Sequence, residues 1–301
     1  MRLPVACLAR TAVLMAFLPL GLARAETTPA KCPALEVLVQ EFTGYAVRAE
    51  SQAAVLGWCV MDRAVMVADR PDWPDLKVAT LRFKGEVEGN VVVAIEVDIA
   101  GLRLVAGLGS KQVDEELQRM FRLQNADLWF RAEVNAEAGR LEVRGFALVL
   151  SGGTEISLSA DLSGAGLSPL GVAAGRLTGL ELQWNADGRL MRGVMEAAGV
   201  GLDGSLAGAE AITAARDGLQ GVIEVLPGSL VDKDSRHELD GMTASLPEGR
   251  GVLQLSFRSD EGIGAADLLV AGLGKAPLEE TLATLFAGSS LQADWSQGLQ
   301  H

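Results

Sequence analysis

Residues 154–163 alternate between apolar and polar side chains with a period of two, and this alternation constrains the fold more than any other feature. The apolar positions are Ile156, Leu158, Ala160 and Leu162, and the polar positions between them are Ser157, Ser159 and Asp161. Successive side chains of an extended strand point to opposite faces of its sheet. One apolar face and one polar face are typical of an antiparallel sheet with one side in water.

Similar strand-like runs recur along the chain. We expect strands at 45–52, 58–68, 76–84, 91–106, 128–135, 140–150, 154–163, 176–185, 251–259, 263–271 and 291–295. Apolar residues at helical spacing predict helices at 110–121, 189–198, 206–226, 231–246 and 277–287. Regular strand–helix–strand alternation is missing, so the predicted class is α+β. The expected architecture is one or two largely antiparallel, twisted amphipathic sheets with several helices packed on one side.

The first 25 residues have the three regions of a secretory signal peptide. Arg2 and Arg10 give a positive start, residues 11–22 are apolar, and residues 23–25 form a small-x-small cleavage site. The apolar run is shorter than the roughly 20 residues of a membrane-spanning helix, and no later stretch is an uninterrupted span. We expect cleavage after residue 25, export to the periplasm, and a single α+β domain over 26–301. The glycine-rich bend at 164–175 is the candidate subdomain boundary.

Charge and cysteine content narrow the functional classes. The chain has 26 Lys and Arg against 39 Asp and Glu, a net charge of −13, which is the wrong sign for a nucleic-acid partner. Removing residues 1–25 removes three arginines and leaves two cysteines, Cys32 and Cys59. A single cysteine pair in an exported protein usually forms a disulfide, and no C-x-x-C redox motif is present. We therefore expect a structural Cys32–Cys59 bridge.

The residues needed for common enzyme chemistry are scarce. Of the two histidines, His301 is terminal, so a serine-hydrolase triad would depend on His237, and no G-x-S-x-G elbow is present. The acidic cluster at 232–240 is interpreted as a solvated helix face. The G-x-G-x-x-G run at 199–204 follows a predicted helix and not a strand, so it is interpreted as a connector. Four of the five tryptophans fall within predicted strands and are expected in the core. These observations favour a non-catalytic protein without cofactor or metal.

The apolar face of such a sheet must be covered by helices, by another sheet or by a ligand. Few aromatic residues and many Ala, Val, Leu and Gly suit a smooth trough for acyl chains, and suit an ordinary core equally well. The residues expected to line an apolar groove are Ile156, Leu158, Leu162, Leu180, Leu182 and Trp184. The first hypothesis is a periplasmic protein that binds lipid or an envelope protein on this face. The alternatives are an acidic scaffold without a small ligand, and an envelope hydrolase that uses His237.

Two segments carry a family resemblance. Residues 128–143 form a strand, a short turn and a second strand, and residues 176–190 lead from a strand through Asp187-Gly188 into a helix. Both are similar to units of AsmA-like and related periplasmic proteins of Gram-negative bacteria. The resemblance implies long amphipathic sheets that help to hold or move lipids in the envelope. The chain is shorter than the AsmA type and is expected to retain no membrane anchor, and no site residues are carried over.

Overall fold

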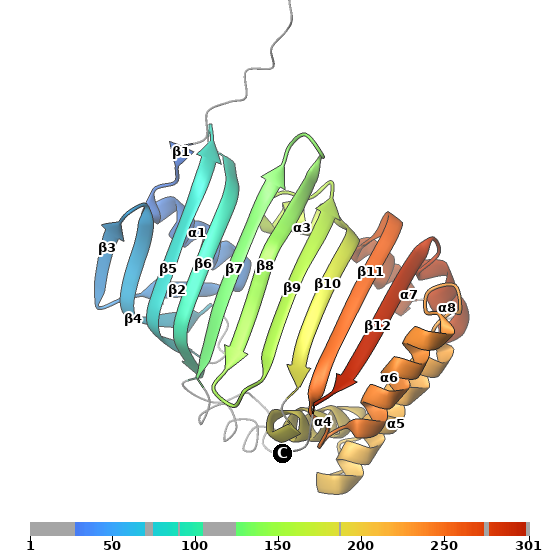
Figure 1. The fold of residues 1–301 in the computed structure, drawn as a ribbon. Helices are drawn as coiled ribbons and strands as arrows, with labels where there is room; N and C mark the ends of the chain where they lie inside the picture. The colour runs from blue at the N-terminus through green and yellow to red at the C-terminus, as the bar shows by residue number, and fades with distance from the viewer. Residues whose placement is uncertain are drawn as a thin grey trace, which may run out of the picture.

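The computed structural model describes residues 28–69, 75–89, 91–104, 125–186, 188–273 and 277–298. The fold is built on a single twisted, open antiparallel sheet of twelve strands (Figure 1). The strands follow the order β12-β11-β10-β9-β8-β7-β6-β5-β4-β2, with β1 paired to β5 and β3 to β4. The predicted α+β class and antiparallel sheet are therefore confirmed.

The strands have the following bounds: β1 (Thr28–Pro29), β2 (Tyr45–Arg48), β3 (Ser51–Val55), β4 (Trp58–Ala68), β5 (Leu76–Glu88), β6 (Val91–Leu104), β7 (Ala126–Asn135), β8 (Arg140–Leu150), β9 (Glu155–Ser163), β10 (Arg176–Ala186), β11 (Gly251–Gly264) and β12 (Ser289–Gln297). The helices are α1 (Cys32–Thr43), α3 (Pro169–Ala174), α4 (Gly188–Leu202), α5 (Gly208–Val225), α6 (Lys233–Ser245), α7 (Ala265–Leu273) and α8 (Leu278–Leu285). No helix of the described residues is both long enough and apolar enough to span a membrane.

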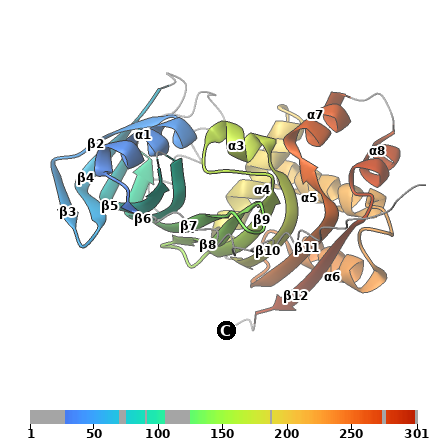
Figure 2. The ribbon, with the colours of Figure 1, turned by 90° about the horizontal axis from the view of Figure 1, so that it is seen from above.

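The helices gather on one side of the sheet. Figure 2 shows α1 over the N-terminal strands, α3 over the middle and α7 on the same side at the C-terminal strands, and Figure 1 shows α4 beyond the lower ends of β10 and β11. Helix α6 runs beside β12, and a parallel bridge between Val231 and Leu291 covers part of that edge. The longest of the described helices, α5, packs against α4 and α6. The expectation that helices pack on one face agrees with this arrangement.

The covered face holds two large buried clusters and one small one. The N-terminal cluster joins α1 to β4–β8 around Leu35, Leu81 and Phe83, which are fully buried. The C-terminal cluster joins β10–β12 to α5 and α6 around Phe257 and Trp295. A third cluster lies between α4 and α5. Apolar burial against helices therefore fixes the two ends of the sheet face.

The segment at 164–175 packs on the N-terminal cluster through Ala165, Leu167 and Val172. It contains the short helix α3, whose N-cap Ser168 accepts a hydrogen bond from the backbone N–H of Gly171. The strands on either side of it, β9 and β10, nevertheless pair directly over their whole length. The sheet is thus continuous across the expected boundary, although β9 contributes Leu162 to the N-terminal cluster and β10 contributes Leu177 to the C-terminal cluster.

Several expected elements differ in the structure. Helix α1 was not predicted at all. Helix α4 does not end at Gly199 but continues to Leu202. The strand expected at 263–271 is wrong, because β11 extends to Gly264 and α7 follows at once. There the backbone N–H of Gly264 donates to the Asp267 carboxylate at 2.8 Å, which favours a helix start. The signal peptide and the helix expected at 110–121 lie outside the described residues.

Candidate binding faces of the sheet

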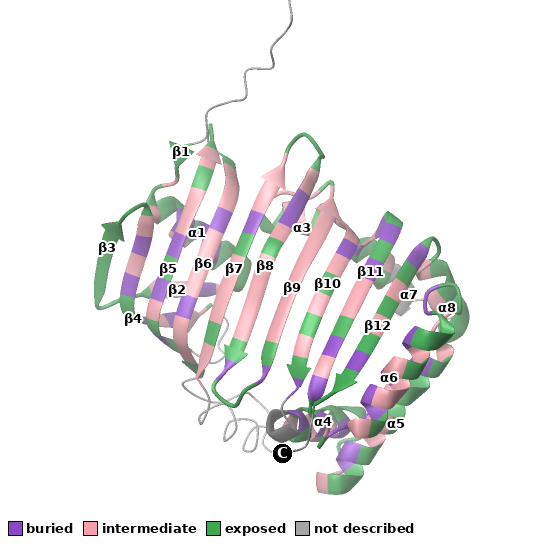
Figure 3. Ribbon diagram, in the orientation of Figure 1, coloured by how far each residue is buried: buried purple, intermediate pink, exposed green. Residues whose placement is uncertain are grey.

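The six groove residues expected from the sequence lie on the covered, apolar face. Ile156 pairs directly with Trp184 and Leu158 with Leu182, while Leu180 pairs with Ala160. Directly opposed residues of antiparallel strands share a face, so the register brings the β9 and β10 positions together. All six are half-buried, and Figure 3 shows the intermediate colour along most of β9.

The six residues differ in what covers them. Leu162 packs against the N-terminal cluster, and Leu180 and Trp184 pack against the C-terminal one. Ile156, Leu158 and Leu182 belong to none of the three clusters that the described residues form. Phe146 and Leu148 of β8, which the sequence analysis did not single out, pair with Leu158 and Ile156 and are likewise outside the clusters. We call these five residues (Phe146, Leu148, Ile156, Leu158 and Leu182) the apolar strip.

The disulfide lies at the N-terminal end of the same face. Cys32 begins α1, and Cys59 is buried in β4 with 2% of its surface exposed. The two are bonded, with Cα atoms 5.6 Å apart, so the predicted pairing is confirmed. The bridge ties α1 to the sheet over the N-terminal cluster.

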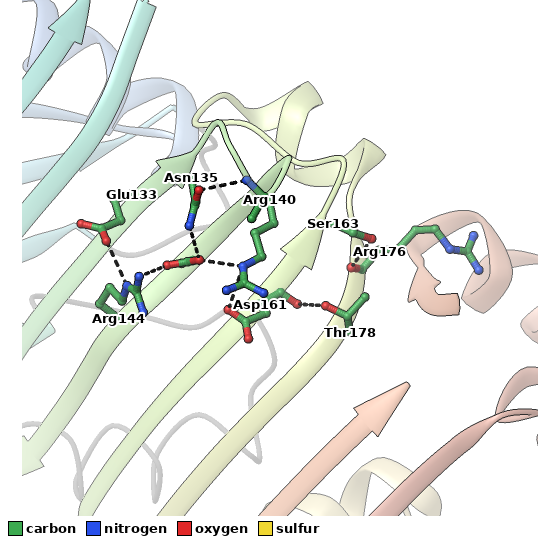
Figure 4. Close-up of polar contacts among 10 residues, drawn as sticks. Glu133, Asn135, Arg140, Arg144, Asp161, Ser163, Arg176 and Thr178 are labelled. Atoms are coloured by element: carbon green, nitrogen blue, oxygen red, sulfur yellow. Dashed lines mark hydrogen bonds and ion pairs between the residues drawn. The ribbon is translucent and has the colours of Figure 1, made fainter. Parts of the chain in front are cut away.

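The opposite face is polar, and its N-terminal half is crossed by ion pairs. They join Arg82 to Asp98, Lys84 to Glu96, Arg131 and Arg144 to Glu133, and Arg140 and Arg144 to Glu142. Figure 4 shows the part of this network around Arg140 and Arg144. Because these charged side chains pair with one another, this half of the face presents few unpaired charges.

Glu142 is the centre of that network, with 1% of its surface exposed. Its Oε1 accepts hydrogen bonds from Arg140 Nε at 2.6 Å and from Asn135 Nδ2 at 3.0 Å. Burial alone would raise the pKa of Glu142. The hydrogen bonds from Arg140 and Asn135 and the charges of Arg144 and Arg140 outweigh burial, so the pKa lies below its ordinary value.

This lowered pKa predicts an acid-sensitive contribution to stability. The ionised Glu142 favours the folded state above the pKa of the unfolded chain, and this contribution is lost as the pH falls through the lower, folded-state pKa. We expect Glu142→Gln to be less stable than the wild type at pH 7 and to lose stability less steeply from about pH 5 to about pH 3. Urea unfolding at several pH values measures this, with the exposed Glu155→Gln as control. Parallel pH profiles for the wild type and Glu142→Gln would contradict the assignment.

The C-terminal half of the polar face is hollowed into an open groove of about 740 Å³. It extends from β7 to β12, and the N-terminal end of α6 adds Asp232 and Ser235 at the β12 side. The register places one row of side chains across all six strands: Trp129, Ala147, Ser157, Gln183, Gln254 and Asp294. A second row is Ser159, Glu181, Ser256 and Gln292. The sequence analysis missed this groove.

The comparisons with known proteins add no assignment. No protein-family model matches the chain, and no curated protein matches it. The roles of the two faces are therefore inferred from their geometry and chemistry.

Two tryptophans correct the expectation that the strand tryptophans lie in the core. Trp184 and Trp295 do pack in the clusters, but Trp58 and Trp129 lie on the polar face. Lys84 Nζ lies 4.4 Å from the centre of the Trp58 ring, a cation–π contact, and Trp129 lines the groove. An aromatic side chain on the wet face requires a reason other than core packing.

The residues considered for catalysis and metal binding are dispersed or serve the fold. His237 is exposed on α6, and no hydrogen bond joins it to another described residue. Asp232 caps α6 by accepting from the backbone N–H of Ser235 at 2.7 Å, and Glu238 accepts from that of Trp295 at 3.2 Å. Within the described ranges, no three His, Cys, Asp or Glu side chains converge as a metal site would require.

Proposed function

We propose that the protein is an exported, non-catalytic binding protein of the cell envelope that holds the acyl chain of a lipid along the apolar strip. The position of the strip is the observation that supports this. Its five apolar side chains are only half-buried by the described residues, on a face whose two ends are buried beneath helices. Burying apolar surface stabilises a protein by about 25 cal/mol per Å², and surface left in water does not contribute this free energy. A contiguous apolar patch of this kind marks a binding site.

The chemistry of the strip favours an acyl chain as its occupant. None of the five side chains carries a charge or a hydroxyl group, so contact with an apolar chain satisfies all of them. Residues 26–301 have 23 Lys and Arg against 39 Asp and Glu, a net charge of −16, which works against docking of the whole molecule on an anionic membrane surface. We therefore propose that single lipids are bound. The lipid role implied by the resemblance to AsmA-like proteins agrees with this.

Two observations support export. The Cys32–Cys59 disulfide requires an oxidising compartment, and the first 25 residues have the pattern of a cleavable signal peptide. Expression in a Gram-negative host, followed by mass spectrometry of the periplasmic protein, tests this. We expect the mass of residues 26–301 less two hydrogens, and a cytoplasmic protein of full length would contradict it.

The lipid proposal predicts that the strip can be disabled without disturbing the other face. In the double variant Leu158→Thr/Leu182→Thr, two paired apolar side chains become hydroxyls while good strand formers are retained. We expect about tenfold weaker binding of the fluorescent fatty acid cis-parinaric acid and loss of any lipid that survives gentle purification in native mass spectrometry.

The matched control changes the neighbouring residues on the polar face of the same two strands. Ser159→Thr/Gln183→Thr should bind parinaric acid like the wild type. Absence of parinaric acid binding to the wild type, or equal loss in the two double variants, would refute the proposal. A polypeptide that crosslinks to position 158 in place of a lipid would assign the strip to a protein partner.

A further inference from the structure

The groove on the polar face differs chemically from the rest of that face. Seven of its side chains are neutral and polar. Ser256 donates to Glu181 at 2.9 Å and Ser235 is hydrogen-bonded to Asp232, and the other five are Ser157, Ser159, Gln183, Gln254 and Gln292. None of these five donates or accepts a side-chain hydrogen bond with another described residue. Next to them, the N-terminal half of the face is occupied by paired charges. The groove is therefore the part of this face where side-chain hydrogen-bond donors and acceptors are free to bind a ligand.

Those groups favour a neutral, hydroxyl-rich ligand. An amide offers two N–H donors and a carbonyl acceptor, and a hydroxyl both donates and accepts, so each can meet a ligand hydroxyl in either role. Among the described residues that line the groove, no positively charged side chain is free to bind an anionic ligand. Glu181 accepts from Arg258 at 2.5 Å and Arg144 donates to Glu133 at 2.9 Å, while Asp294 has no partner among the described residues. Phosphates and carboxylates are disfavoured by Asp294 and Asp232.

Trp129 gives the groove an aromatic surface at its β7 end. A Cβ atom at position 145 would collide with the ring atoms Cζ3 and Cη2 of Trp129, so the ring lies against the sheet over Gly145. Its Nε1 donates to Glu96 Oε1 at 3.2 Å, and Glu96 is held in turn by Lys84 at 2.9 Å. The indole is thus held by its packing on Gly145 and by its hydrogen bond to Glu96. Flat apolar faces with polar edges are what tryptophan contributes to a wet binding site.

The shape of the groove indicates a chain and not a single ring. The row from Trp129 to Asp294 crosses six strands, and strands lie about 4.8 Å apart, so the row is about 24 Å long. The groove is open along this length. A linear ligand could lie across the strands and meet a polar side chain at each one.

We propose that this groove binds an uncharged oligosaccharide chain, with one pyranose ring stacked on Trp129 and the remaining rings hydrogen-bonded along the two rows. Phe146, Leu158 and Leu182 of the apolar strip also border the groove, but the pairing register places their side chains on the other face of the same strands. Failure of this proposal and failure of the lipid proposal are therefore separable.

The test is a titration of the full mature protein with three neutral tetrasaccharides: chitotetraose, cellotetraose and maltotetraose. We expect at least one to bind, as measured by calorimetry and by a change in tryptophan fluorescence. Trp129→Ala should weaken that binding about tenfold and abolish the fluorescence change. Gln183→Ala/Gln254→Ala should also weaken it, and these exposed, unbonded side chains can be removed without disturbing the fold.

Two controls make the result specific. Gln297→Ala removes an exposed glutamine of β12 that does not line the groove and should leave sugar binding unchanged. Leu158→Thr/Leu182→Thr should lose lipid and retain sugar. The proposal is overturned if none of the three sugars binds. It is equally overturned if binding survives both groove variants intact, or if a tetramer of galacturonic acid binds as tightly as the neutral sugars.

Discussion

Replacing Cys32 and Cys59 together by alanine is expected to lower the free energy of unfolding by about 3.5 kcal/mol. The bridge spans 27 residues, and its removal lets the unfolded chain explore conformations that the crosslink forbids. The loss is expected to be large because the bridge joins α1 to the N-terminal cluster, where Leu35 and Cys59 are buried. Urea unfolding of wild type and variant, analysed by linear extrapolation, measures the difference.

Reductant provides the matched control for this prediction. Wild-type protein unfolded in the presence of dithiothreitol should lose about as much stability as the alanine variant, and the variant should be insensitive to the reagent. A loss below about 1 kcal/mol in both experiments would show that α1 docks on the sheet without help from the crosslink.

The second large effect concerns Gly199, where α4 crosses α5. A Cβ atom there would overlap the backbone carbonyl of Ala211, which is fully buried. Glycine inside a helix usually costs about 0.5–1 kcal/mol relative to alanine, but here the close approach requires it. We expect Gly199→Ala to destabilise the protein by about 1–3 kcal/mol, as overpacking does.

Gly201, two residues later in the same helix, is the control. A Cβ atom at position 201 meets nothing within 4 Å, so Gly201→Ala should be neutral or stabilising by up to about 1 kcal/mol. Thermal unfolding of both variants compares them directly. If Gly199→Ala raises the melting temperature as much as Gly201→Ala does, the helices do not approach as closely as described.

The Gly199 contact also explains why the sequence misleads here. Residues 199–204 contain three glycines, which locally favour the end of a helix. The structure extends α4 to Leu202 because Gly199 permits packing against α5, and the sequence does not reveal which helix will lie opposite. By contrast, α1 carried a readable signal, since Leu35, Leu38 and Val39 are buried at helical spacing.

The two binding faces differ in how far sequence could predict them. Alternation within β9 was enough to place Ile156 and Leu158 on an apolar face, because strand geometry is local. The polar groove depends on the register between β10 and β11, whose sequences are separated by residues 187–250. Gln183 and Gln254 become neighbours through that pairing, which no local pattern encodes. The position of Trp129 similarly depends on Gly145 of the next strand.

The order of the strands has a consequence for how the protein is made. From β4 to β12 the spatial order repeats the order of synthesis, so a chain delivered N-terminus first can add each new strand to a partner already in place. Local pairing of this kind favours rapid folding. The longest connection between neighbouring strands is that of β10 and β11, where residues 187–250 intervene in place of a turn such as residues 136–139. Because each doubling of a loop costs about 0.6 kcal/mol, this closure costs about 2.4 kcal/mol more than that turn. The last two strands should therefore join late, once α4, α5 and α6 have assembled.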